Sequence, residues 1–436
     1  MSRRFLTACL VMLSLGVASA GDAVAPKSAA WSQWRGPNRD GKSAETGLLK
    51  GFPAGGPTLL WQVTETDVIG TGYGTPAVAN GRLYIVGADT AKSDAAESVV
   101  CLNAATGAPI WKMPLDTAKG SFLDGWGGGP RSTPTVDGDF LYVLGSTGDL
   151  AALKTATGEI VWKKNLAKDF GGTIPKWGYS ESVLIDGDRL ICTPGKKNGM
   201  VALDKKTGNT VWSCTDLTDE AGYSSVIPAT FGGVKQYVQQ TMEHAVGVNA
   251  ADGKLLWKVG EIKRRVAVIP TPVVAGYSIY FTAGYGAGGE LVTVAPDGKS
   301  AKVTHKTSSV SNHHGGVIEL DGKLYGHSDS KKWFCYDYQA GGDDLVWTSN
   351  DLDKGSITYA DGQFYCYGQG KGTLVTIQAS DKAWQETGRF TIPETSKVRP
   401  GQGQIWAHPV VAEGRLYLRD YDKLFVYDIA AKAKPQ

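Results

Sequence analysis

Three of the chain's six histidines fall in one stretch, Ser308 to His327, with the sequence SSVSNHHGGVIELDGKLYGH. Imidazole nitrogens bind transition metals and also serve as general acids and bases. Successive residues of a strand point to opposite sides, so His313 and His314 are poorly arranged to hold one metal ion. His327 lies at the far end of the following hairpin. The stretch therefore predicts no metal site. It leaves His314 as a candidate binding residue, with His313 packed or hydrogen-bonded between neighbouring sheets.

The elements that carry such residues belong to a repeat of about 45 residues, a period typical of propellers and solenoids. Each clear copy joins an apolar strand, a polar turn with a glycine, and a second strand that ends on tryptophan. The four copies are CLNAATGAPIW (101–111), ALKTATGEIVW (152–162), ALDKKTGNTVW (202–212) and GVNAADGKLLW (247–257). We expect the turn glycines, Gly107, Gly158, Gly208 and Gly253, at positive φ, and the tryptophans between neighbouring sheets.

A second hairpin precedes each of these segments, as in TPAVANGRLYIV from Thr75, and it occurs eight times along the chain. Two hairpins per copy give four strands, so the sequence predicts an all-β, eight-bladed propeller of four-stranded antiparallel blades. The copies at 290–304 and 374–390 have drifted and lack the closing tryptophan. The last copy stops after three strands, and we expect Thr58–Val63, with Trp61, to complete it as an N-terminal outer strand that closes the ring.

These observations divide the chain into four parts. Residues 1–20 read as a signal peptide, with Arg3 and Arg4, an apolar run and the small residues Ala18-Ser19-Ala20. Residues 21–57 form an N-terminal extension, residues 58–430 the propeller and residues 431–436 a C-terminal tail. We therefore expect an exported protein, periplasmic or extracellular, cleaved near Ala20. No apolar run is long enough for a membrane-spanning helix.

Charge and cysteine content narrow the classes of partner. Without the two signal arginines the chain has 43 basic and 43 acidic residues, and this balance gives no support for nucleic-acid binding. The five cysteines of the mature chain, Cys101, Cys192, Cys214, Cys335 and Cys366, lack metal-site spacing and lie in apolar strand-like runs. We expect them to be small buried side chains.

Alignment of the eight innermost strands places chemically active side chains at one mouth of the central channel. One position reads Tyr73, Arg131, Tyr179, Tyr223, Ile269, His314, Lys354 and Trp406, and the next position of the same parity includes Glu181 and His408. The upstream loops add Trp126, Trp177, Arg264 and Arg265. These residues predict a funnel that stacks on a planar group or a sugar and pairs with an anion through Arg131 and Lys354. The alternative is that they fill the narrow channel around ordered water.

Eleven residues are therefore the funnel candidates for ligand binding: Tyr73, Arg131, Trp177, Tyr179, Glu181, Tyr223, Arg264, His314, Lys354, Trp406 and His408. Glu181 and His408 are the best acid–base candidates among them. They belong to blades three and eight, which are not neighbours in the ring, so we expect no direct contact and assign no catalytic residue. No metal ligands are assigned either.

The repeat resembles the pyrroloquinoline-quinone-like family of β-propellers, whose tryptophan-docking motif is similar to ALKTATGEIVW. The resemblance covers about Thr58 to Ile429, and it implies either a quinoprotein dehydrogenase or a non-catalytic relative such as the assembly factor BamB. The segments WSQWRGPNRDG, WGYSES and NHHGG are similar to those of secreted propellers of planctomycete-type bacteria. The dehydrogenases cap their quinone with a disulfide between adjacent cysteines and hold calcium through Glu, Asn and Asp; this sequence has no Cys-Cys pair.

From the sequence we expect an exported, non-catalytic propeller that binds or scaffolds a protein, small-molecule or carbohydrate ligand at its funnel. The alternative is a dehydrogenase that acts on an alcohol or carbohydrate with pyrroloquinoline quinone (PQQ) and calcium. No cofactor is firmly predicted.

Overall fold

The computed structural model of the chain describes residues 30–89, 96–115, 126–260, 266–329 and 332–431. The predicted signal peptide and Arg264 lie outside these residues. Within the described part, no helix has the length and apolar character needed to cross a membrane. The only helices there are two short ones, α1 (Thr66–Ile69) and α2 (Leu166–Phe170).

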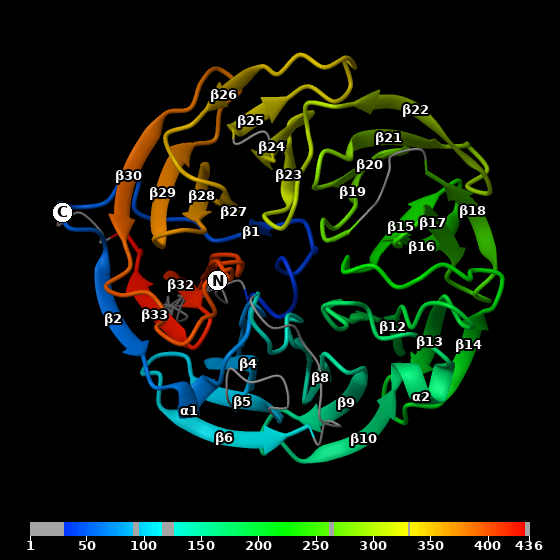
Figure 1. Ribbon diagram of the computed structural model, residues 1–436, viewed down its shortest axis with the longest axis horizontal. Helices are drawn as coiled ribbons and strands as arrows, with labels where there is room; N and C mark the ends of the chain where they lie inside the picture. The colour runs from blue at the N-terminus through cyan, green and yellow to red at the C-terminus, as the bar shows by residue number, and fades with distance from the viewer. Residues whose placement is uncertain (1–29, 90–95, 116–125, 261–265, 330–331, 432–436) are drawn as a thin grey trace, which may run out of the picture.

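Eight separate sheets stand around a central channel, which confirms the predicted eight-bladed propeller (Figure 1). The first strand of each blade lies next to the channel, and most neighbouring first strands contact one another. Apolar residues from several strands of each blade pack between the sheets, so the core is divided into clusters between neighbouring blades.

The strands of blades one to four are β3 (Ala77–Ala79), β4 (Arg82–Ala88), β5 (Glu97–Asn103), β6 (Pro109–Pro114), β7 (Thr135–Asp137), β8 (Phe140–Leu144), β9 (Asp149–Lys154), β10 (Ile160–Asn165), β11 (Leu184–Asp186), β12 (Arg189–Cys192), β13 (Met200–Asp204), β14 (Thr210–Cys214), β15 (Ile227–Phe231), β16 (Val234–Gln240), β17 (Ala245–Asn249) and β18 (Leu255–Val259). The strands of blades five to eight are β19 (Val273–Ala275), β20 (Ser278–Ala283), β21 (Gly288–Val294), β22 (Ala301–Thr307), β23 (Val317–Leu320), β24 (Lys323–Ser328), β25 (Lys332–Tyr336), β26 (Trp347–Ser349), β27 (Gly355–Ala360), β28 (Gln363–Gly368), β29 (Thr373–Gln378), β30 (Glu386–Thr391), β31 (Val410–Ala412), β32 (Arg415–Asp420) and β33 (Lys423–Asp428).

The ring closes through its N-terminal outer strand, as predicted. Strand β2 (Thr58–Val63) pairs antiparallel with β33, with Val63 opposite Leu424. The eighth sheet therefore contains strands from both ends of the propeller. This pairing covers an edge that would otherwise be open to pairing with another chain.

The repeat tryptophan of one blade docks on the turn glycine of the next. Trp162 of blade two lies against Gly208 of blade three, and its indole nitrogen donates to the main-chain oxygen of Lys205 at 2.9 Å. Trp61, Trp111 and Trp212 make the same contact with Gly107, Gly158 and Gly253. These four glycines have φ between 72° and 76°, which confirms the predicted left-handed turns.

Replacing Gly208 by alanine should lower the free energy of unfolding by about 2 kcal/mol. About half of the loss comes from the left-handed backbone, and the rest arises because the new methyl carbon would lie 2.8 Å from the Trp162 ring. Gly187→Ala is the matched control, since Gly187 has φ of 60° and no atom within 4 Å of such a carbon. Urea denaturation compares the two variants, and equal losses would contradict a docking role for Trp162.

The two drifted copies form complete blades because other contacts replace the tryptophan. In blade five the register places His305 at the tryptophan position, and its ring lies on Gly341 of blade six. In blade seven Gly388 takes that position, and Phe52 from the N-terminal extension packs against it.

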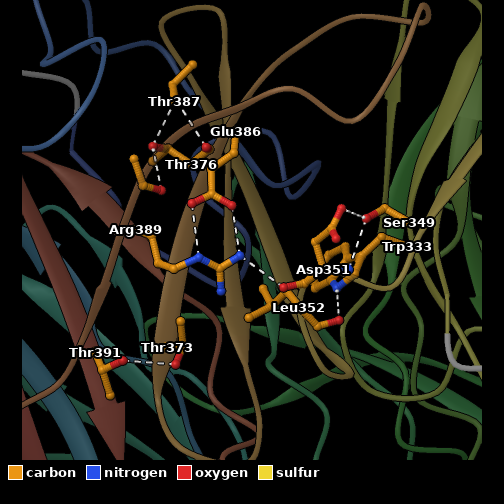
Figure 2. A network of polar contacts seen from close by, with 11 residues as sticks. Trp333, Ser349, Asp351, Leu352, Thr373, Thr376, Glu386, Thr387, Arg389 and Thr391 are labelled. Carbon is orange, nitrogen blue, oxygen red and sulfur yellow. Dashed lines mark hydrogen bonds and ion pairs between the residues drawn. The ribbon is translucent and has the colours of Figure 1, made fainter.

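Polar contacts also fix the outer strand of blade seven (Figure 2). Arg389 of β30 makes two hydrogen bonds to Glu386, at 3.0 and 2.8 Å, and one to the main-chain oxygen of Asp351 at 2.9 Å. Asp351 lies in the loop that leaves blade six, so this arginine joins two blades.

Part of the N-terminal extension lies inside the ring, which the sequence did not predict. Residues 31–45, here called the channel segment, run from blade one to blade seven (dark blue in Figure 1). Trp31 pairs with Val78 of blade one, and strand β1 (Lys42–Ser43) pairs in parallel with β27 of blade seven. The segment therefore crosses the inside of the ring between these two blades.

Candidate functional site

A cavity with mostly aromatic walls opens at one mouth of the channel, at the place where the aligned inner strands predict a funnel. We call it the funnel and define it by its lining residues. They are Trp34, Tyr73, Trp126, Arg131, Trp177, Ser180, Tyr223, Ser225, Ala267, Ile269, Tyr285, His313, His314, Trp406 and His408. Nearly half of them are tryptophan or tyrosine, so the funnel offers ring faces to a bound molecule.

Seven of the eleven candidate residues line this funnel: Tyr73, Arg131, Trp177, Tyr223, His314, Trp406 and His408. Three others, Tyr179, Glu181 and Lys354, are not among its lining residues, and Arg264 lies outside the described residues. The hydroxyl of Tyr179 donates to the main-chain oxygen of Pro194 at 2.9 Å. Ligand binding by the seven lining residues stays a prediction.

The channel segment supplies the funnel floor. Trp34 lines the funnel, donates from its indole nitrogen to Thr271 at 2.9 Å, and packs edge-on against His408 with 4.7 Å between ring centroids. Repeat alignment could not find Trp34, because it lies outside the repeats; the paired tryptophans of WSQW were the one available signal.

Two buried arginines hold this floor in place. Arg35 donates to the main-chain oxygen of Val317 in blade six, and Arg39 donates to that of Ser182 beside blade three, each at 2.6 Å. Burial lowers the pKa of both guanidinium groups to about 10. Both arginines line a second cavity, which shares no lining residue with the funnel.

The aromatic rings at the mouth contact one another at a range of angles. Trp406 packs on Tyr73 with 4.6 Å between centroids and a tilt of 41°. Trp126 lies beside Trp406 at 6.5 Å and 26°, and Trp177 lies beside Tyr223 at 5.8 Å and 55°. These rings support one another, and together they form a curved surface.

The two cations expected to pair with an anion already have protein partners. Arg131 lies over the Tyr73 ring, 4.9 Å from its centroid, and donates to the main-chain oxygens of Gly129 and Gly127 at 3.0 and 3.1 Å. Burial lowers the pKa of this guanidinium. The ammonium of Lys354 forms an ion pair with Asp329 and a hydrogen bond with His313.

His313 lines the funnel and is also hydrogen-bonded to Lys354, which directly precedes strand β27 of blade seven, in line with the expected packing or hydrogen bonding between blades. It contacts Tyr285 edge-on at 4.7 Å, and its Nδ1 lies 2.8 Å from the Lys354 ammonium. Strand β23 begins only at Val317, so His313 and His314 precede the strand on which alternating side chains were expected. Burial, and then the charge of Lys354, lowers the pKa of His313 to about 4.

His314 is the least satisfied polar side chain of the funnel. It is 5% exposed, and neither of its ring nitrogens has a hydrogen-bond partner within the described structure. Burial lowers its pKa well below the usual value, and the neighbouring His313 adds to this effect. The imidazole is therefore neutral near pH 7, with one nitrogen that donates and one that accepts.

Glu181 and His408, the acid–base candidates, have separate partners. The Glu181 carboxylate accepts from the main-chain nitrogen of Thr193 at 2.8 Å, and burial raises its pKa to about 7. Nε2 of His408 lies 2.9 Å from the main-chain oxygen of His314. Burial, and then the charge of Arg35, lowers the pKa of His408 to about 3.

The funnel residues do not fit a quinone held with calcium. Every one of the five described cysteines is buried and free, so none forms the disulfide cap that the resemblance implies. No acidic side chain occurs among the described residues that line the funnel. Throughout the described ranges, no three His, Cys, Asp or Glu side chains gather as a metal site.

Comparisons with known proteins agree with this fold. Residues 46–121 and 95–343 match the family described as outer membrane protein assembly factor BamB. BamB of Salmonella typhimurium is 29% identical over 146 residues, 34% of this chain and 32% of that protein. The chain thus spans about a third of the length of the first curated relatives that it matches.

Solved structures show the same architecture. BamB from Moraxella catarrhalis superposes with a TM-score of 0.60 at 14% identity, covering 87% of this chain and 99% of that one. The quinohemoprotein alcohol dehydrogenase ADHIIG from Pseudomonas putida HK5 gives 0.61 at 12% identity, covering 94% and 81%. At such low identity these likenesses show the fold alone. Because the family match extends over more than half of the sequence, the chain belongs to the BamB family of PQQ-repeat β-propellers.

Proposed function

We propose that the protein is an exported, non-catalytic binding module that holds a small ligand in the funnel. The observation that carries this proposal is the aromatic cavity whose floor is built by the chain's own channel segment. The proposal of export is supported by the signal-like sequence of residues 1–20 and by the family description, which names an outer membrane factor.

Native mass spectrometry of the full chain, purified from its own host, tests whether the funnel is occupied. We expect a bound small mass on the wild-type protein and its loss from Trp406→Ala, because Trp406 contacts both Tyr73 and Trp126 at the mouth. Tyr277→Ala is the control, since Tyr277 is 46% exposed and is not a funnel residue. A wild-type protein without bound mass, or one whose mass survives Trp406→Ala, would contradict the proposal.

Addition of the dehydrogenase's cofactors distinguishes the proposed binding module from the dehydrogenase alternative. We expect titration of the purified protein with pyrroloquinoline quinone and calcium to give no saturable change in absorbance, because the described residues of the funnel lining offer neither a disulfide cap nor a carboxylate. Reduction of a redox dye that depends on both additives would overturn the binding-module reading.

A further inference from the structure

Among the described residues that line the funnel, none offers an unpaired charge to a ligand. Arg131 is the one residue of the described lining that is charged near pH 7, and it donates to two main-chain oxygens and lies on the Tyr73 ring. Burial keeps the histidines of the lining neutral, and no acidic residue occurs in the described lining. Placing a charged group in such a site costs free energy unless an opposite charge meets it. A neutral ligand therefore suits the funnel best.

The angles between the rings favour a puckered ligand over a flat one. Most neighbouring rings are tilted, as for Tyr73 with Trp406 at 41° and Trp177 with Tyr223 at 55°. Trp126 and Trp406 are the pair closest to parallel in the described lining. They stack on each other, with 6.5 Å between ring centroids. The rings thus form a cup rather than a slot. A sugar ring is puckered, so its C–H groups can contact aromatic rings that are tilted to one another. A flat heterocycle stacks best on rings that are parallel to it.

The polar groups of the lining match hydroxyl groups. His314 is 5% exposed, and neither of its ring nitrogens has a hydrogen-bond partner among the described residues. In the neutral imidazole one nitrogen donates and the other accepts. A hydroxyl group is likewise both donor and acceptor, so hydroxyls can satisfy either nitrogen. Ser180 and Ser225 add two hydroxyls to the same lining. Unpaired buried nitrogens are costly, and a hydroxyl-bearing ligand would recover that loss.

We propose that the ligand of the funnel is a neutral carbohydrate, such as a sugar or the end of a glycan, stacked on Trp126 and Trp406 and hydrogen-bonded to His314. This inference rests on the proposed function, because it names the class of ligand for the same cavity.

Isothermal titration calorimetry of the full-length protein with defined oligosaccharides tests the proposal. The probes are neutral cello-, malto-, xylo- and manno-oligosaccharides, with oligogalacturonate as the acidic comparison. We expect saturable binding of at least one neutral probe and weaker binding of the acidic one. Trp126→Ala and His314→Phe should each lower the affinity about tenfold, because one removes a stacking surface and the other removes both ring nitrogens.

Tyr277→Ala is the matched control for Trp126→Ala, since the two side chains are 46% and 42% exposed. It should bind the neutral probe like the wild-type protein. Binding of the acidic probe alone, or binding that survives both funnel variants, would overturn the carbohydrate assignment. A co-purified ligand that is not a sugar, and that Trp406→Ala releases, would overturn this assignment while keeping the proposed function. Absence of both a co-purified ligand and sugar binding would overturn both.

Discussion

Replacing Trp31 by alanine should lower the free energy of unfolding by about 3 to 5 kcal/mol, as for other fully buried tryptophans. The side chain is 2% exposed and packs in the core between blades eight and one, in the same cluster as Leu83 and Val410. Its main-chain nitrogen and oxygen both pair with Val78 at 2.9 Å. The surrounding strands belong to a closed ring and cannot collapse into the space left behind, so the cavity should persist.

Urea denaturation of the Trp31→Ala protein measures this loss, and Trp126→Ala is its control. Trp126 is 42% exposed at the funnel mouth, so its truncation should change stability by less than about 1 kcal/mol. Because Trp31 anchors the channel segment that carries Trp34, Trp31→Ala should also weaken ligand retention in the funnel. Equal stability of the two variants would show that the channel segment is not part of the cooperative core.

The blades could be predicted because each one is encoded locally. A turn glycine, a strand and a closing tryptophan lie within a few residues of one another, as at Gly208 and Trp212. The contacts that replace the repeat tryptophan in blades five and seven could not be predicted in this way. Phe52 reaches Gly388 across more than three hundred residues, and His305 meets Gly341 only after two sheets have formed. Nothing in the local pattern indicates either pair.

The funnel was partly predictable for a similar reason. Aligned strands fix where a residue sits along the channel, and this was enough to bring together Tyr73, Tyr223 and Trp406. Alignment does not fix side-chain direction in the irregular loops before each strand, so Tyr179 bonds to Pro194 instead. Trp34 had no aligned equivalent at all. Its position depends on the arginines of the channel segment, which bind carbonyl groups of distant blades.

Glu181 should make the protein less stable as pH rises from about 4.5 to about 7. Burial raises the pKa of this carboxyl from 4.5 to about 7, although the charge of the nearby Arg39 opposes the shift. Within that window the folded state holds a proton that the unfolded state has released, so rising pH favours unfolding. The shift corresponds to about 3 kcal/mol of stability, present below the unfolded pKa and lost above the folded one.

The Glu181→Gln variant isolates this effect from other titrating groups. His313 and His408, with pKa values lowered to about 4 and about 3 chiefly by burial, act in the opposite direction. Their folded forms release protons that the unfolded chain keeps, so they lower stability as pH falls below about 6.5. The pH profile of stability mixes both trends, whereas the difference in free energy of unfolding between variant and wild type reports Glu181 alone.

We expect that difference to be small near pH 4 and to favour glutamine by about 3 kcal/mol near pH 8, measured by urea denaturation across pH. A difference that does not change with pH would mean that Glu181 ionises as an ordinary carboxyl, with its negative charge fully balanced by the hydrogen bonds from Thr193 and by Arg39.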